Sequence, residues 1–307
     1  MSRRRVLLLT ALGPVLCGML VASLLTAAWL VVGRPTAAQG EIWFRLQQVS
    51  SEARYSGSPD QPVFFIVIGS DAREGGPGGM RGDSVHVVGV NPALGAATII
   101  GVPRDTAVPI PGQGTNKINA ALQFGGLALQ AQTVSDLFGI AVPYAVVTAF
   151  DGFVAMVDEM GGIDINMPVE QNDPDSGAVF SPGLQHIDGR QALAFARNRK
   201  DFASGDVARS ENQGLLMVSA LATLRSQNAG AAGTMRLLGI LGRHTEIQGM
   251  NLIDLYRFAR LGLSIDPANI RNVVLPTGGG SGSDLSVGAG AADLLADFRD
   301  DAVLQTH

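Results

Sequence analysis

The sequence predicts an α/β (α+β) protein, a three-layer α–β–α sandwich with a mixed central sheet, preceded by one N-terminal transmembrane helix. Two observations lead to this prediction. Short runs rich in β-branched residues are interspersed with amphipathic helical stretches, and such mixed elements pack as layers around one sheet. Near the N-terminus, residues 6–32 carry no charge. A helix needs roughly 20 apolar residues to cross a bilayer, so this run is long enough.

Composition narrows the classes of function. Of the 307 residues, 46% are hydrophobic and 16% charged, which excludes a disordered chain. The net charge of −5 argues against non-specific nucleic-acid binding as the main role. The single cysteine, Cys17, excludes an intramolecular disulfide and a cysteine-based zinc site. The four histidines have no paired ligand spacing, and His86 is expected to be a packed or surface residue of a strand rather than a ligand.

The N-terminal region predicts a single-pass membrane anchor. Three arginines at positions 3–5 precede the apolar run, so the positive-inside rule places the N-terminus in the cytoplasm. A cleaved signal peptide is the alternative, although its apolar core would be only about 7–15 residues long. We therefore expect a cytoplasmic tip and anchor at 1–36, a tether at 37–61 and an extracytoplasmic domain at 62–302.

Three predicted strands at the start of that domain bring charged residues together. The strands cover 64–68, 84–90 and 98–102, and turn residues separate them. If neighbours pair antiparallel, the end of the first, the start of the second and the end of the third share one edge. That edge would carry Asp71, Asp83, Arg104 and Asp105. Carboxylates beside arginines favour a site for a metal and a phosphate.

The remaining elements follow from periodicity and turn signals. Helices are expected over 117–122, 127–138, 150–160, 189–197, 209–224, 235–241, 252–261 and 291–298. Further strands are expected over 144–148, 163–167 and 269–276, and loops over 172–182 and 278–282. Gly125 and Gly126 should separate the first two helices, and Gly161 should cap the third at its C-terminus.

The first candidate site surrounds the glycine-rich loop at 75–79. Asp71 and Asp83 flank this loop and could hold Mg²⁺, leaving positions for waters and phosphate oxygens. Arg73 and Arg81 lie in the same stretch. The alternative is that the two aspartates only cap turns beside the loop glycines. Spacing alone favours neither interpretation.

The second candidate site combines Arg104 with Lys117. An arginine at a strand end can direct two donors at one phosphate, and a lysine adds a point charge. In the alternative interpretation, Arg104 and Asp105 pair with neighbouring residues, and Lys117 is a solvated loop residue.

The third candidate site lies around the start of the predicted helix 209–224. Arg209 and Gln213 are four residues apart and therefore share one helix face. Free N–H groups and the helix dipole favour an anion at this end. Asp206 would cap the helix, act as a general base, or do both. Arg197 and Arg199 are expected at a helix end, where exposure to water without a ligand is the alternative.

These stretches together resemble the LytR–CpsA–Psr family. The matching segments are GSDAREGGPGGMRGDSVHVVGVN, IIGVPRDTAVPIPG, NKINAAL, DGFVAMVDEMGGIDINMP, IDGRQALAFARNR and GDVARSENQ, in the expected order within residues 62–225. The resemblance implies an α–β–α sandwich whose interior accepts a prenyl tail. It also implies an extracytoplasmic phosphotransferase that moves an anionic glycopolymer from a polyprenyl pyrophosphate carrier to peptidoglycan, through a phosphodiester link.

The resemblance also implies roles for individual residues. Asp71 and Asp83 match the aspartates that bind Mg²⁺, and Asp206 matches a proposed base that activates the acceptor hydroxyl. The residues that match the pyrophosphate-binding set are Arg81, Arg104, Arg197, Arg199, Arg209 and Gln213, with Arg73 and Lys117 matching less closely. Arg104 is also expected to take part in catalysis. The last segment ends Asn212-Gln213-Gly214 instead of the usual basic-Gln-Gln, which removes one cation.

Two other functions fit the same residues. One is a membrane-anchored pyrophosphatase of lipid-linked diphosphates, with water as acceptor. The other is a non-catalytic protein that binds or senses the lipid carrier. The sequence does not name the polymer. Its Ala- and Gly-rich composition and its preference for Arg over Lys suit a high-GC bacterium, in which the cargo could be arabinogalactan, a teichoic-type polymer or a capsule.

Overall fold

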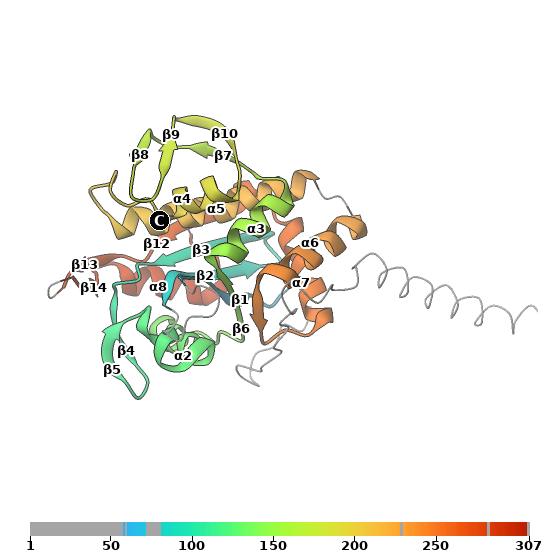
Figure 1. Ribbon diagram of the computed structural model, residues 1–307. Helices are drawn as coiled ribbons and strands as arrows, with labels where there is room; N and C mark the ends of the chain where they lie inside the picture. The colour runs from blue at the N-terminus through green and yellow to red at the C-terminus, as the bar shows by residue number, and fades with distance from the viewer. Residues whose placement is uncertain (1–57, 59, 72–80, 228–229, 281–282, 306–307) are drawn as a thin grey trace, which may run out of the picture. The chain divides into compact units, whose positions relative to one another are not determined.

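The computed structural model describes residues 58, 60–71, 81–227, 230–280 and 283–305 (Figure 1). The chain divides into two compact units, 1–42 and 43–307, and every described residue belongs to the second. The expected anchor at 1–36, most of the tether and Arg73 lie outside the described residues. No helix in the described ranges is long and apolar enough to cross a membrane.

A six-stranded mixed sheet forms the centre of the second unit (Figure 1), in the order β11-β6-β1-β2-β3-β12. Its strands are β1 (Val63–Ser70), β2 (Gly82–Asn91), β3 (Ala96–Val102), β6 (Tyr144–Ala149), β11 (Glu246–Gln248) and β12 (Ile270–Val274). β1, β2 and β3 pair antiparallel, which confirms the predicted meander. β6 runs parallel to β1 and β12 parallel to β3, whereas β11 is antiparallel to β6. The sheet is therefore mixed, as predicted.

Helices cover both faces of this sheet. The helices are α2 (Ala120–Phe138), α3 (Phe150–Met160), α4 (Gly189–Arg197), α5 (Asp206–Gln227), α6 (Gly230–His244), α7 (Leu252–Ser264) and α8 (Ala291–Asp301), with a 3₁₀ turn η1 (Pro267–Asn269). In β1, Ile66 and Ile68 pack toward α2 and α8, whereas Phe65 and Val67 pack toward α5 and α7. Alternate side chains of a strand point to opposite faces, so the two helix layers enclose the sheet.

Among the described residues, four two-stranded sheets lie outside the central sheet, and three of them are hairpins of consecutive strands. They are β4 (Ala107–Ile110) with β5 (Gly114–Lys117), β7 (Ile163–Met167) with β10 (Gly183–Ile187), β8 (Gln171–Asp173) with β9 (Ala178–Phe180), and β13 (Thr277–Gly279) with β14 (Leu285–Val287). The loop predicted over 172–182 contains β9 and part of β8, and the helix predicted over 117–122 begins only at Ala120, so both predictions are wrong in part. Strands of three or four residues are too short to show a period, so pairing decides them.

Several helix boundaries follow from local sequence. Gly161 takes a left-handed conformation (φ 87°) at the end of α3, as predicted. Gly125 and Gly126 have non-helical backbone angles and break α2 where predicted. A capping box between Asp188 and Gln191 starts α4. α5 begins at Asp206, earlier than the predicted start at residue 209, so Asp206 lies in the first turn.

Candidate active site

A β-bulge presents Asp83 at one edge of the sheet. Ser70 pairs with Gly82 and Gly69 pairs with Ser84, so Asp83 is the extra residue of β2. Asp83 and its neighbour Ser84 consequently line the same cavity, although consecutive strand residues normally face opposite sides.

Asp71 follows β1 at the same end of the sheet. Its Oδ1 accepts a hydrogen bond from the backbone N–H of Arg81 at 3.0 Å. Its own N–H donates to the Arg81 carbonyl at 3.3 Å. The backbone bond continues the β1–β2 pairing beyond Ser70, so Asp71 and Asp83 emerge from neighbouring strands.

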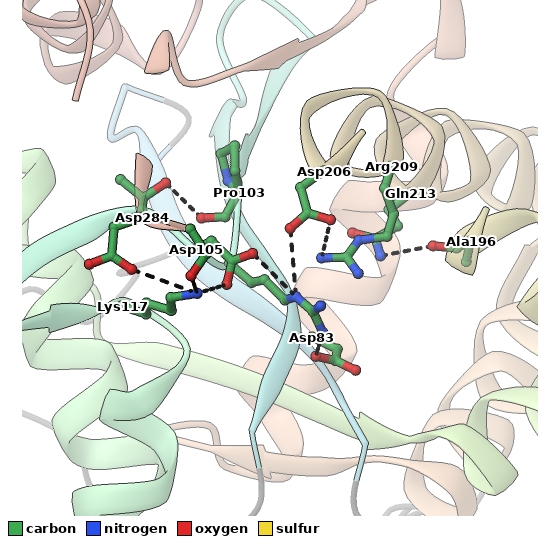
Figure 2. A network of polar contacts seen from close by, with 12 residues as sticks. Asp83, Pro103, Asp105, Lys117, Ala196, Asp206, Arg209, Gln213 and Asp284 are labelled. Carbon is green, nitrogen blue, oxygen red and sulfur yellow. Dashed lines mark hydrogen bonds and ion pairs between the residues drawn. The ribbon is translucent and has the colours of Figure 1, made fainter. Parts of the chain in front are cut away.

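Arg104, which follows β3, is the centre of a charged network (Figure 2). Its Nη1 donates to Asp83 Oδ1 at 2.5 Å, and its Nε lies 3.7 Å from Asp206 Oδ2 and 4.0 Å from Asp105 Oδ2. Burial by itself lowers the pKa of Arg104. The hydrogen bond and charge of Asp83, with the charges of Asp206 and Asp105, outweigh burial and raise this pKa above its ordinary value.

Asp206 lies between two arginines at the start of α5. Its Oδ1 is 3.2 Å from Arg209 Nη2, and its side chain is 12% exposed. Burial raises the pKa of Asp206, and a hydrogen bond to Asp105 raises it further, while Arg209 and Arg104 oppose part of this shift. Burial also acts to raise the pKa of Asp105, but hydrogen bonds to Asp206 and Lys117 lower it overall. Asp105 is therefore the more easily ionised of the two carboxyl groups.

Arg209 and Gln213 lie one helical turn apart on α5. The Arg209 side chain is 7% exposed, and burial lowers its pKa despite the nearby charge of Asp206. Gln213 Nε2 donates to the backbone carbonyl of Ala196 at 3.0 Å, as Figure 2 shows. This bond joins α5 to α4 directly behind the charged network.

A cavity of about 610 Å³ opens beside this network. Its inner wall is apolar and includes Val67, Phe153, Met156, Leu216, Met217 and Ala220. Basic side chains outnumber acidic ones on its wall, with Arg104, Arg197, Arg199, Lys200 and Arg209 against Asp83, Asp173 and Asp175. The cavity thus combines an apolar wall with a cationic rim.

The end of α4 presents two arginines to this cavity. Arg197 is the last helical residue, and its guanidinium carbon lies 5.4 Å from the centre of the Phe150 ring. The following residue, Asn198, is fully buried and donates to the side chains of Gln171 and Asp201. Because Asn198 leaves the helix in an extended conformation, Arg197 and Arg199 both reach the cavity wall.

Arg81 and Lys117 line a different cavity. This second cavity, of about 550 Å³, shares Arg104 with the first. Lys117 Nζ binds Asp105 Oδ1 at 2.8 Å and Ser283 Oγ at 3.0 Å, and lies 3.7 Å from Asp284 Oδ1. The structure therefore separates two members of the expected pyrophosphate-binding set from the others. Asp71 is absent from the described lining of both cavities.

Some site features were not predicted from sequence. Asp284 lies in a Gly- and Ser-rich segment that carries no motif. His86 was expected to be a packed or surface strand residue. It is buried, and both of its ring nitrogens have polar contacts: Nε2 lies 3.1 Å from the Ser210 carbonyl, and Nδ1 lies 3.0 Å from Ser84 Oγ. Burial lowers the pKa of His86 to about 4, against a smaller opposing effect of the Ser210 bond. The neutral ring donates a hydrogen bond from Nε2 to the Ser210 carbonyl, so its Nδ1 accepts a hydrogen bond from the Ser84 hydroxyl.

Several buried polar atoms at the rim have no hydrogen-bond partner within the described ranges. They are Arg104 Nε, Asp206 Oδ1, Arg209 Nε and Gln213 Oε1. Buried polar groups are normally paired because an unpaired one costs about 1–3 kcal/mol. Three of these atoms, on Arg104, Arg209 and Gln213, belong to residues that line one cavity, which indicates a ligand site there.

The fold and this site define a mixed α/β protein with cationic side chains beside an apolar cavity. The chain belongs to the LytR_cpsA_psr family, whose model matches residues 38–287. The family predicted from the sequence segments is thereby confirmed.

Relatives and solved structures agree with this family. A polyisoprenyl-teichoic acid–peptidoglycan teichoic acid transferase TagU from Bacillus mycoides (strain KBAB4) is 35% identical over 161 residues, which cover 52% of each chain. The chain therefore spans about half the length of such curated relatives. The crystal structure of B. subtilis TagV has a TM-score of 0.68 at 23% identity, covering 80% of this chain and 99% of that one. A structure of TagT bound to LI-WTA has a TM-score of 0.66 at 22% identity, covering 88% and 99%. At these identities the two structures show the shared fold.

Proposed function

We propose that this protein transfers an anionic glycopolymer from a polyprenyl pyrophosphate carrier to peptidoglycan, forming a phosphodiester link. The observation that carries the proposal is the 610 Å³ apolar cavity that opens onto Arg104, Arg209 and their unpaired polar atoms. A ligand with a hydrocarbon tail and a diphosphate head matches both parts. The name of the TagU relative and the ligand of the TagT structure support the same substrate class.

The two parts of the cavity would act on different parts of the carrier. Burial of the prenyl tail against Phe153, Met156 and Leu216 would contribute about 0.8 kcal/mol per methylene. Arg104 and Arg209 would bind the diphosphate through charge-assisted hydrogen bonds. Arg209 is deeply buried, so an anion there would be shielded from water, where such bonds are strongest.

Asp71 and Asp83 would hold Mg²⁺. Their carboxylate oxygens are the ligands that this ion prefers, and their strands are neighbours. In the part of the chain that the structure describes, no group of three His, Cys, Asp or Glu side chains could hold a metal. Waters and substrate phosphates would therefore complete the coordination, as is usual for Mg²⁺. When bound, the ion would neutralise charge on the diphosphate.

Asp206 would act as the base in the transfer step. Its carboxylate would accept the proton of a peptidoglycan hydroxyl, whose oxygen attacks the sugar-linked phosphorus. The bond from that phosphorus to the bridging oxygen breaks, and polyprenyl phosphate leaves. Arg104 and Arg209 would stabilise the charge that develops on the phosphoryl oxygens and on the leaving phosphate.

We also propose that residues 1–36 anchor the protein in the cell membrane, with the N-terminus cytoplasmic and the catalytic domain outside. The arginines at positions 3–5 and the uncharged run at 6–32 support this orientation. Such an anchor would keep the cavity close to the lipid carrier.

The test uses the full-length protein with a lipid-linked glycopolymer, with and without peptidoglycan. We expect polymer linked to peptidoglycan through a phosphodiester, and a loss of about 10²–10³-fold in rate for Arg104→Ala. Leu94→Ala, a truncation of an exposed side chain in the turn at the other end of the sheet, serves as the matched control.

Each outcome separates the candidate functions. Release of free polymer at the same rate with and without peptidoglycan would identify a pyrophosphatase. Binding of the carrier without any turnover would identify a non-catalytic carrier protein. Full activity of Arg104→Ala would overturn the proposed site itself.

A further inference from the structure

The second cavity has the composition of a carbohydrate site. Asn119 lines it and is only 6% exposed. Gln123 accepts a hydrogen bond from Arg81 Nε at 3.3 Å through its Oε1, which leaves its amide nitrogen available. Side-chain amides both donate to and accept from sugar hydroxyls. An asparagine and a glutamine in the wall of one cavity can therefore bind the hydroxyls of a sugar that enters it.

An aromatic ring completes this cavity. Phe124 lines it with 44% of the residue exposed. The helix breaks at Gly125 and Gly126, directly after Phe124, so the ring lies at the end of the first segment of α2. A flat apolar ring beside polar amides suits the C–H face of a pyranose, since the hydroxyls at the edge of the sugar then meet the amides.

The second cavity is attached to the reaction centre. Arg104 and Asp105 both line it, and Arg104 also lines the apolar cavity. The backbone N–H of Asn119 donates to the Arg104 carbonyl at 3.4 Å. Figure 2 shows Asp105 and Lys117 on one side of the network and Arg209 and Gln213 on the other. The two cavities therefore meet at Arg104.

The direction of the reaction assigns this cavity to the acceptor. In phosphoryl transfer the attacking and leaving oxygens lie roughly in line, on opposite sides of phosphorus. If the leaving polyprenyl phosphate occupies the apolar cavity, the attacking hydroxyl arrives from the other side of Arg104. Asp105, which hydrogen-bonds to Asp206, lies on that side.

We propose that the second cavity binds the sugar unit of the acceptor glycan that carries the attacking hydroxyl, with Phe124 stacking on its ring and Asn119 and Gln123 binding its polar groups. This assignment rests on the proposed transferase function. The hydroxyl oxygen forms the new bond to the sugar-linked phosphorus, its proton passes to the Asp206 carboxylate, and the bond to the bridging oxygen breaks with release of polyprenyl phosphate.

The experiment measures the KM for the acceptor and the KM for the donor separately. The full-length protein in detergent is assayed with a soluble amino-sugar tetrasaccharide from peptidoglycan and a lipid-linked glycopolymer, and tetrasaccharide binding is measured by NMR titration. We expect Phe124→Ala to raise the acceptor KM and the tetrasaccharide Kd about tenfold, the effect of losing one aromatic contact. Phe124→Tyr should restore both values. Leu94→Ala, another truncation of an exposed apolar side chain, should behave as the wild type.

The outcomes separate this assignment from the proposed function. Transfer by the wild type with unchanged acceptor KM in both Phe124→Ala and Asn119→Ala would overturn the acceptor site and leave the transferase function standing. A raised donor KM alone would place the donor sugar in this cavity and also overturn the assignment. Tetrasaccharide binding that depends on Phe124, in a wild type without transfer activity, would support the carbohydrate site while the proposed function fails.

Discussion

Two carboxyl groups beside Arg104 differ in their tendency to hold a proton. Burial and a hydrogen bond to Asp105 raise the pKa of Asp206, while the contacts of Asp105 with Asp206 and Lys117 lower the pKa of Asp105. A base whose pKa is raised toward the working pH is a stronger proton acceptor once it is ionised. Asp105 therefore raises the pKa of Asp206 although Asp105 itself does not line the apolar cavity.

This pairing predicts a shift in the pH dependence of transfer. Asp206 must be ionised to accept a proton, so the rate should rise with pH through its raised pKa. Asp105→Asn removes the neighbouring charge that raises this pKa, and the acidic limb of the rate profile should move to lower pH. The measurement is the transfer rate against pH for wild type and Asp105→Asn. An acidic limb at the same pH in both proteins would contradict the coupling.

His86 is a second residue whose environment fixes its protonation state. It is fully buried between Ser84 and Ser210, and burial lowers its pKa from 6.5 to about 4. The unfolded chain therefore binds a proton at His86 before the folded protein does. The stability that this neutral histidine contributes is present above pH 6.5 and is lost as the pH falls from 6.5 toward 4.

The predicted consequence is a loss of stability in a pH range above that in which most carboxylates titrate. From pH 7 to pH 5, His86 should account for a fall of about 2 kcal/mol in the free energy of unfolding. His86→Gln should lack this part of the fall, whatever its stability at pH 7. Urea denaturation of both proteins at the two pH values measures the difference. Equal falls in the two proteins would show that His86 does not titrate as stated.

At the scale of elements, β2 packs against helices on both faces of the sheet. Gly89 faces α8, where an added Cβ would lie 2.6 Å from the Phe298 ring and 2.8 Å from Ala302. Phe298 also makes edge contacts with the Phe64 and Phe138 rings. A close-packed core cannot absorb a methyl group at this contact without moving the ring or the strand.

Gly89→Ala should therefore destabilise the fold by about 1–3 kcal/mol through overpacking. The matched control is Gly262→Ala in α7, where nothing lies within 4 Å of the added Cβ. Because alanine favours a helix more than glycine does, the control should gain about 0.5–1 kcal/mol. Thermal unfolding of both variants tests the pair. A stable Gly89→Ala protein would mean that α8 can shift away from the sheet.

At the scale of the whole molecule, the helix layer of α3, α4 and α5 leaves a cavity where a filled core was equally compatible with the sequence. α3 and α5 supply Phe153, Met156, Leu216 and Ala220 to its wall. A cavity of about 610 Å³ lies within the usual 300–1,000 Å³ of ligand sites. Its dimensions should therefore limit the length of the lipid tail that binds.

Filling the cavity should weaken binding of long carriers selectively. We expect Ala220→Trp to raise the KM for a full-length polyprenyl donor at least about tenfold, because the lost burial of two methylenes alone is of that order. A donor with a short prenyl chain should be affected much less. Ala231→Trp, on an exposed position of α6, is the control for bulk. Equal effects on long and short donors would place the tail elsewhere.

Local sequence predicted the elements with strong periodicity or strong turn signals. The β1–β3 meander, α3 with Gly161, the break at Gly125 and Gly126, and β7 were all placed correctly. The short hairpins were missed because three or four residues carry no period. Lys117 was placed in a helix, whereas its backbone pairs with Ala107 in a hairpin.

The sequence by itself determined the family, the mixed α/β fold and the convergence of charged residues at one edge of the sheet, because motif order and strand direction are local properties of the chain. Only the tertiary structure decided how those residues divide. Arg209 lies on the apolar cavity, Arg81 and Lys117 lie on a second cavity, and Arg104 belongs to both. That division depends on how helices from distant parts of the chain pack against the sheet, and no local pattern encodes it.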